Sequence, residues 1–155
     1  MRLGRCVRVV LAWGVPWVAF AAVSACDEPP PFPPPTDTCT ILPTLSSLKE
    51  NYFARSCVFS GCHLGRRAEA NLDLTTDDLH ALLVGVGVED ALAAARGKIR
   101  VVPGDPDGSF MLQKVENRQA ADEGGIMPED ADGPVDPDCR IKMLRQWIAD
   151  GALDN

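Results

Sequence analysis

Two cysteines and a histidine fall within seven consecutive residues of this chain, in the string Cys57-Val58-Phe59-Ser60-Gly61-Cys62-His63. Thiols this close, with an imidazole directly after the second, can form a short disulfide, bind a metal ion or be joined to a cofactor. Each of these outcomes cross-links the chain within this segment or bonds the segment to a ligand. The rest of the fold therefore has to be built around this segment.

The order of these residues is typical of covalent haem attachment. In the usual string, Cys-x-x-Cys-His, each thiol adds to a haem vinyl group and the histidine binds the iron on its proximal side. Here four residues separate Cys57 from Cys62 instead of two. The two additional residues must loop outward, and Gly61 gives the backbone the freedom to do so. We therefore expect covalent haem c on Cys57 and Cys62, with His63 as the proximal ligand.

The first 25 residues are typical of an export signal. Three arginines and no acid precede an uncharged run from Val9 to Ala25, as in a signal peptide. The run ends in Val23-Ser24-Ala25-Cys26, which resembles the bacterial lipobox, where the cysteine is lipidated and becomes the mature N-terminus. We expect Cys26 to carry lipid, and alternatives are an ordinary cleaved signal or an uncleaved anchor.

The predicted organisation has three parts: a lipoprotein signal peptide over 1–25, a tether over 26–38 and one domain over 39–155. Six of the seven positions from 29 to 35 are proline, which predicts an extended polyproline spacer. Without the three arginines of the leader, 12 basic residues stand against 22 acidic ones, a formal net charge of −10. This charge argues against a nucleic-acid partner. An acidic surface either helps solubility or steers an encounter with a basic surface on another protein.

Two further cysteines, Cys39 and Cys139, lie near the two ends of the predicted domain. If lipid occupies Cys26 and haem occupies the pair at 57 and 62, these two are left to form a disulfide in an oxidising compartment. Connectivity does not follow from sequence alone, and a short Cys57–Cys62 disulfide is the rival pairing.

Helical periodicity dominates the predicted domain. Leu45, Leu48 and Tyr52 have helical spacing, and Ser47 to Glu50 predicts a capping box for a helix that leads into Cys57. Short helices are expected after Asp78, over 91–96 and over 110–115, and a last helix from Pro137 to Gly151. Its apolar stripe is Ile141, Leu144 and Ile148, flanked by Met143 and Trp147. Since no strand-length alternation appears, the domain should be mostly α.

The candidates for a second iron ligand are His80, Met111, Met127 and Met143. Met111 and Met143 fall within predicted helices, where methionine usually fills a core. Met127 lies in the irregular, acid-rich segment 120–136, before Pro128, and no packing period explains it. We therefore favour Met127 as the distal ligand and keep His80 in reserve.

From about Leu45 to Leu153 the chain resembles the small class I cytochrome c domains of exported bacterial lipoproteins, including those with widened haem motifs. The resemblance rests on the haem string after a first helix, the 102–106 turn, the Met127-Pro128 loop and the closing 147–152 segment. It implies a small helical domain with long irregular loops, whose first and last helices pack together. It also implies a prolyl carbonyl, here that of Pro103, that accepts a hydrogen bond from the proximal histidine.

The resemblance implies a lipid-anchored monohaem c-type cytochrome that carries single electrons and is not an enzyme. We expect a periplasm-facing lipoprotein of the bacterial envelope, membrane-bound through its lipid, with redox protein partners. Alternatives are a haem-free, disulfide-stabilised interaction module and a haem-based sensor. A zinc site of Cys57, Cys62, His63 and His80, or a redox thiol pair of thioredoxin type, fits an exported helical domain less well.

Overall fold

The first helical segment runs from Leu45 to Ser56 and ends one residue before Cys57. The computed structural model describes residues 39–155, so the predicted signal peptide, Cys26 and the tether lie outside the described residues. The segment has three consecutive parts with one π-helical stretch in the middle: α1 (Leu45–Leu48), η1 (Lys49–Phe53) and α2 (Ala54–Ser56). The expected helix that leads into Cys57 is therefore confirmed.

The cap of this helix lies one turn earlier than the sequence suggested. Thr44 is the capping residue, because its Oγ1 accepts a hydrogen bond from the Ser47 amide at 3.3 Å. Ser47 in turn accepts a hydrogen bond from the Leu42 amide at 2.9 Å. The predicted capping box at Ser47 is wrong, since Ser47 already belongs to the first helical turn.

The last helical segment consists of η4 (Pro137–Ile141), which is π-helical, and α6 (Lys142–Ala149). Gly151 follows it at a φ of +99°, as expected for a helix stop. Trp147, expected to flank the apolar stripe, is fully buried, and its indole N–H donates to the Leu153 carbonyl at 2.9 Å. The core face of this helix is thus wider than the stripe predicted.

Short helices occupy the middle of the domain. Three of them were expected, namely α3 (Leu79–Leu83), α4 (Ala91–Ala95) and α5 (Phe110–Val115), whereas η2 (Gly65–Arg67) and η3 (Glu69–Asn71) were not. The Asp90 side chain caps α4. Ser109 stands at the cap position of α5, but its hydroxyl instead receives a hydrogen bond from the Val102 amide and donates to the Asp105 carbonyl. It therefore ties together the turn that precedes the helix.

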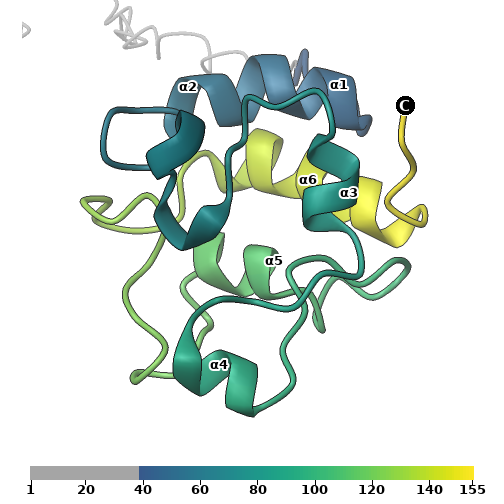
Figure 1. The fold of residues 1–155 in the computed structure, drawn as a ribbon. Coiled ribbons are helices and arrows are strands. Elements are labelled where there is room, and N and C mark those ends of the chain that lie inside the picture. The colour runs from purple at the N-terminus through teal and green to yellow at the C-terminus, as the bar shows by residue number, and fades with distance from the viewer. Residues whose placement is uncertain (1–38) are drawn as a thin grey trace, which may run out of the picture. The chain divides into compact units, whose positions relative to one another are not determined.

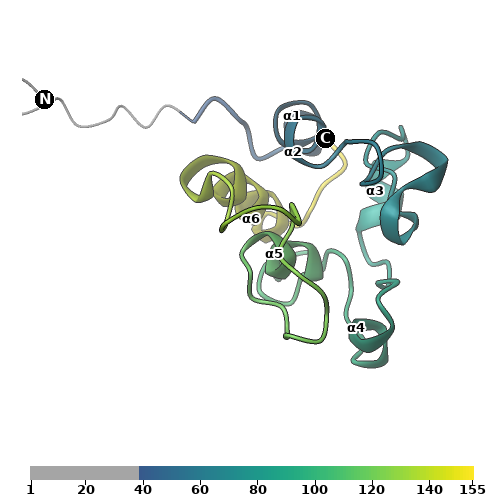
Figure 2. The ribbon, with the colours of Figure 1, turned by 90° about the vertical axis from the view of Figure 1, so that its left-hand side faces the viewer.

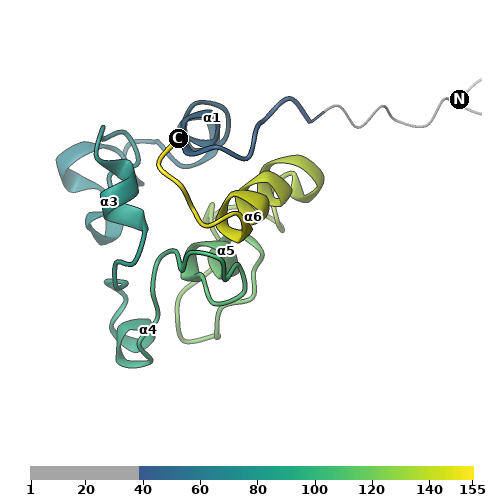
Figure 3. The same cartoon turned by 90° about the vertical axis from the view of Figure 1, so that its right-hand side faces the viewer.

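The first and last helical segments pack together, as predicted. α1 contacts α6, and Figure 1 shows α6 directly below α1 and α2. In Figures 2 and 3, α5 lies beside α6, and α3 lies on the other side of the first helical segment. Leu48, Phe53, Leu144 and Ile148 are fully buried in one core cluster. Among residues 39–155 the regular elements are helices with only isolated β-bridges between them, so the mostly α class is confirmed.

Candidate functional site

The end of α2 sets the position of Cys57. The Cys57 amide donates to the Phe53 carbonyl at 2.8 Å, which closes the last helical turn. Its side chain is half-buried against the core cluster, and it is a free thiol. Burial raises the pKa of Cys57 to about 12, although Arg140 opposes that shift. The thiol at 57 is therefore protonated at neutral pH.

The widened spacing is accommodated by a surface turn. The Cys62 amide donates to the Phe59 carbonyl at 3.0 Å, and Gly61 has a φ of +84°. The His63 amide then donates to the Cys57 carbonyl at 3.2 Å, which returns the chain to the point where the turn began. Cys62 is exposed and is also a free thiol. The additional residues therefore bulge outward without moving His63 away from the end of the first helix.

The His63 imidazole is held through one of its two nitrogens. Its Nδ1 lies 3.0 Å from the Leu72 carbonyl oxygen. Because a carbonyl only accepts, Nδ1 carries the proton in this contact, and Nε2 is the ring nitrogen that a metal could bind. The backbone is also fixed, since the Leu74 amide donates to the His63 carbonyl at 3.1 Å. The prediction that Pro103 supplies this carbonyl is wrong, because Leu72 occupies that role.

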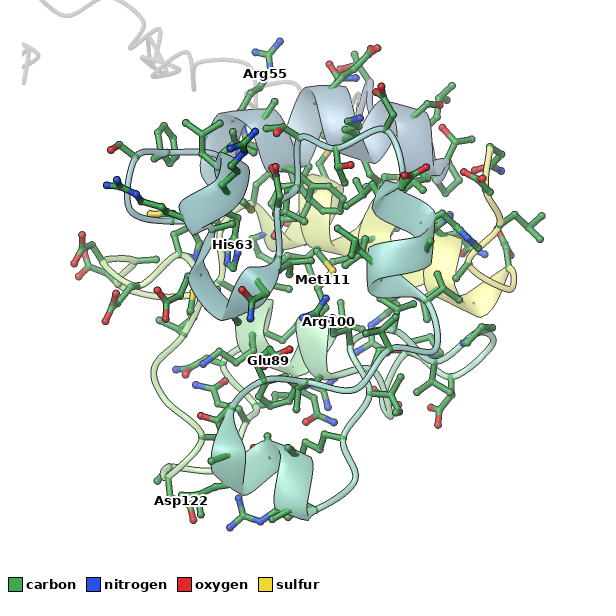
Figure 4. The ribbon with its side chains drawn as sticks, in the orientation of Figure 1. Arg55, His63, Glu89, Arg100, Met111 and Asp122 are labelled. Atoms are coloured by element: carbon green, nitrogen blue, oxygen red, sulfur yellow. A yellow bond between two sulfur atoms is a disulfide. The ribbon has the colours of Figure 1, made fainter. Side chains whose placement is uncertain are left out.

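Met127 lies in a loop that is attached to α5. Its amide donates to the Lys114 carbonyl at 3.0 Å, and its side chain is half-buried against the core cluster. Met111 and Met143 are also half-buried against that cluster, from α5 and α6. Figure 4 shows Met111 in the middle of the view, whereas Arg55 and Asp122 lie at opposite edges. Because Met111 and Met127 are half-buried against the same cluster, a Met111 variant is a suitable control for a Met127 variant.

His80, the alternative distal ligand, contacts a backbone carbonyl in the structure. Its Nε2 lies 2.8 Å from the Ala152 carbonyl oxygen, which joins α3 to the segment after α6. This contact engages the Nε2 nitrogen of His80. Among residues 39–155, no three His, Cys, Asp or Glu side chains gather closely enough to hold a metal ion.

The two remaining cysteines are joined to each other. Cys39 and Cys139 form a disulfide with a Cα–Cα distance of 5.2 Å. It connects the start of the domain to the first turn of η4. The predicted pairing is confirmed, and the cysteines at 57 and 62 are left unpaired.

Three buried charged residues were not anticipated from the sequence: Arg100, Lys114 and Glu123. Arg100, whose side chain is 7% exposed, donates to the Leu82 and Ala70 carbonyls at 2.8 and 2.9 Å. The signal for its burial is its position inside the apolar run from Ile99 to Val102. Glu123 is fully buried and anchors the 120–136 loop. Nothing in that Gly-rich and acidic segment marks this carboxylate as different from its neighbours.

The residue types present are those that could hold a covalently attached haem. Two unpaired thiols flank a surface turn, the adjacent imidazole presents Nε2, and a half-buried methionine lies in a loop fixed to α5. No family model, curated protein or solved structure matches this chain. No helix in the described residues has the length and apolar character needed to cross a membrane. The case for a haem site therefore rests on the local chemistry of these residues.

Proposed function

We propose that this protein is a lipid-anchored monohaem c-type cytochrome that carries single electrons at the bacterial cell envelope. The observation that carries this proposal is the orientation of His63, whose Nδ1 is fixed by the Leu72 carbonyl beside two thiols that are not joined to each other. When bound, haem c supplies the reversible one-electron chemistry of iron. The haem would be attached through Cys57 and Cys62.

The roles of the ligating residues follow from their contacts. The hydrogen bond between His63 and the Leu72 carbonyl fixes the ring orientation and increases the basicity of Nε2, as second-shell contacts of metal-bound histidines do. We assign the opposite side of the iron to Met127, because its loop is held by Lys114 and its thioether is half-buried. A methionine ligand raises the reduction potential. Because His63 and Met127 would both bind the iron and leave it no position for a substrate, we propose a carrier and not an enzyme.

The proposed location follows from the leader. The signal peptide over 1–25 and the lipobox at Cys26 support export and lipid attachment. Twelve residues of proline-rich tether would reach about 35 Å, enough to hold the domain clear of the lipid headgroups. The protein would then exchange electrons with redox proteins on the periplasmic side of the membrane.

A haem stain tests the proposal directly. The full chain is produced in a host with c-type haem maturation, separated on a denaturing gel and stained for haem peroxidase activity. We expect a stained band at the mass of the chain, because thioether bonds survive denaturation. The double variant Cys57→Ser/Cys62→Ser should lose the stain, and the matched Cys39→Ser/Cys139→Ser variant should keep it. An unstained wild-type band would refute the cytochrome proposal.

The second candidate function is a haem-free interaction module on a tether. It is favoured by the Cys39–Cys139 disulfide and by a core cluster formed by the chain's own side chains. Intact mass separates the two candidates. A mass that lacks haem and is lower by two hydrogens for each of two disulfides would support the module, with Cys57 joined to Cys62.

Substitution of Met127 tests the distal assignment. In the haem-loaded protein, Met127→Ala should abolish the weak sulfur-to-iron absorption band and lower the midpoint potential, because the thioether that favours ferrous iron is lost. Met111→Ala and Met143→Ala are the matched controls, since both side chains are half-buried against the same core. An unchanged band in Met127→Ala would exclude Met127 as the ligand.

A further inference from the structure

We propose that Lys114 and Glu123 are positioning residues for Met127. They hold the 120–127 segment on α5 and thereby set how strongly the Met127 thioether is kept at the distal position. This inference rests on the proposed function, because it concerns control of the same iron ligand. It is carried by a buried cluster of charged side chains that hydrogen bonds connect to Met127.

Lys114 holds the segment at two points. Its backbone carbonyl accepts the Met127 amide at 3.0 Å, and its Nζ donates to the Glu123 carbonyl at 3.1 Å. The Lys114 side chain is buried, and a Cβ added at Gly124 would lie 3.2 Å from Nζ, so the loop backbone packs closely against the ammonium group. Main chain and side chain of one residue on α5 therefore fix the loop at 123 and at 127.

The Glu123 side chain joins the same segment to the chain after α4. It is fully buried, and its oxygens accept hydrogen bonds from Arg96 and Lys98 at 2.9 and 2.7 Å and from the Ala120 amide at 2.9 Å. Figure 4 shows the adjacent Asp122 near α4, where it pairs with Arg96 at 2.7 Å. Because a buried carboxylate is costly without its donors, Glu123 cannot leave this position while the cluster is intact.

The negative charge of Glu123 balances more than its two direct partners. The acids near Lys114 are Asp90, Glu123 and Glu129, and of these only Glu123 is buried. The Phe110 ring lies between the two lysines, with its centroid 5.1 Å from Lys98 Nζ and 5.9 Å from Lys114 Nζ. Loss of the carboxylate charge would leave neighbouring cations repelling one another in a site with little water. Glu123 therefore keeps the Lys114 ammonium in place as well as its own loop.

The residues between Glu123 and Met127 have little rigidity of their own. Met127 lies four residues after Glu123, and the first two residues of this stretch are Gly124 and Gly125. Glycine has no side chain to pack and a wide choice of backbone conformations. The position of Met127 is then decided by the anchors at its two ends, the Glu123 contacts and the Met127 amide bond to Lys114. Weaker anchors would raise the fraction of molecules in which the thioether is detached.

Hydrogen exchange of the Met127 amide measures this anchoring with or without bound haem. We expect Glu123→Gln and Lys114→Met, each made in the full chain, to speed exchange at Met127 by about tenfold, because local opening of the loop becomes easier. The Leu48 amide, bonded to the Thr44 carbonyl at 3.0 Å, reports global unfolding and should change much less. Unchanged exchange at Met127 in both variants, or an equal rise at Leu48, would overturn the proposal.

Two matched variants control for the type of substitution. The Glu116 carboxylate accepts hydrogen bonds from Arg145 on α6 at 2.8 and 2.9 Å, outside the 120–127 segment. Lys142 is exposed on α6. Glu116→Gln and Lys142→Met should leave exchange at Met127 close to that of the wild type. Control variants that speed this exchange as much as the test variants would contradict a specific role for Lys114 and Glu123.

Competition by added imidazole tests the effect on the distal position. In the haem-loaded full chain, imidazole binds iron only when Met127 is detached, so both test variants should bind it about tenfold more tightly than the wild type. The midpoint potential should fall in the same direction as in Met127→Ala. In a Met127→Ala background, Glu123→Gln should have no further effect on imidazole affinity, because no thioether remains to be positioned. A further tenfold gain in that background would overturn the proposal.

The two measurements separate the possible failures. Faster Met127 exchange in the test variants of a chain that shows no haem stain would support the anchoring and refute the cytochrome function. A stained chain whose imidazole affinity is the same in the wild type and both test variants would refute the positioning role and leave the cytochrome function standing.

Discussion

At the scale of single residues, the two histidines differ in which ring nitrogen is engaged. His63 uses Nδ1 on the Leu72 carbonyl, whereas His80 uses Nε2 on the Ala152 carbonyl. Nε2 is the nitrogen farther from the backbone, so His63 presents the more accessible nitrogen and His80 does not. This difference is the physical reason for assigning the iron to His63 and for preferring Met127 to His80 on the other side.

The two free thiols should differ in reactivity in protein prepared without haem. Burial raises the pKa of Cys57 to about 12, so at pH 8 roughly one molecule in 10,000 carries a thiolate there. Cys62 is exposed. We expect iodoacetamide to modify Cys62 at least 100-fold faster than Cys57, as measured by peptide mass spectrometry.

Unfolding provides the control for this thiol labelling. In concentrated guanidinium chloride both cysteines are solvated, and their rates of alkylation should become similar. Equal rates in the folded protein would contradict the burial of Cys57. Loss of both reactive thiols without alkylation would instead indicate that Cys57 and Cys62 had formed a disulfide.

At the scale of elements, Glu123 holds the 120–136 loop in place. Its carboxylate accepts hydrogen bonds from Lys98 and Arg96 at 2.7 and 2.9 Å and from the Ala120 amide at 2.9 Å. The Lys98 contact is the main cause that lowers the pKa of Glu123. A carboxyl group with a lowered folded pKa stabilises the protein above its unfolded pKa, and this contribution is lost as pH falls through the folded value.

Glu123→Gln should therefore lower Tm by several degrees at pH 7 and should weaken the dependence of Tm on pH below about 4.5, the ordinary value for this carboxyl group. Thermal unfolding followed by circular dichroism at pH 7, 5 and 3 measures both effects. Glu129→Gln is the control, because Glu129 lies in the same loop, is exposed and has no ion pair within the described residues. Identical Tm curves for the two variants would show that Glu123 does not anchor the loop.

The helices were predictable because their signals are local. Apolar spacing located the first and last segments, and turn residues bounded 110–115. The Cys39–Cys139 pair was predicted as one of two possible pairings, on the assumption that lipid and haem occupy the other cysteines. Glu123 and the Leu72 carbonyl were not predictable, because their partners lie elsewhere in the chain and a backbone carbonyl carries no residue signature. The residues of the candidate site were thus visible in sequence, but the groups that orient them were not.

At the scale of the whole domain, contacts between distant parts of the chain close the structure. The Asn155 backbone and side-chain oxygens accept hydrogen bonds from the Ser46 and Leu45 amides at 2.8 and 3.0 Å. The C-terminal residues therefore rest on the start of α1, as Figure 1 shows. His80 adds a third connection through Ala152. Together with the disulfide, these contacts link both ends of the described chain to the pair formed by α1 and α6.

The disulfide should make the largest single contribution to this closure. Cys39 and Cys139 are 100 residues apart in sequence, and closing a loop of that length stabilises a fold by about 4 to 5 kcal/mol in the chain-entropy model. The double variant Cys39→Ser/Cys139→Ser should therefore have a Tm lower by about 15 °C, given the unfolding entropy of a domain of this size. Differential scanning calorimetry of oxidised protein measures this change.

Reduction separates the effect of the cross-link from that of the serines. Dithiothreitol should lower the Tm of the wild type toward that of the double variant and leave the double variant unchanged, because only the wild type has this loop to open. A wild-type Tm that resists complete reduction would mean that the core and the contacts of the C-terminal residues already confine the chain. In that case the disulfide would be secondary to the packing of α1 against α6.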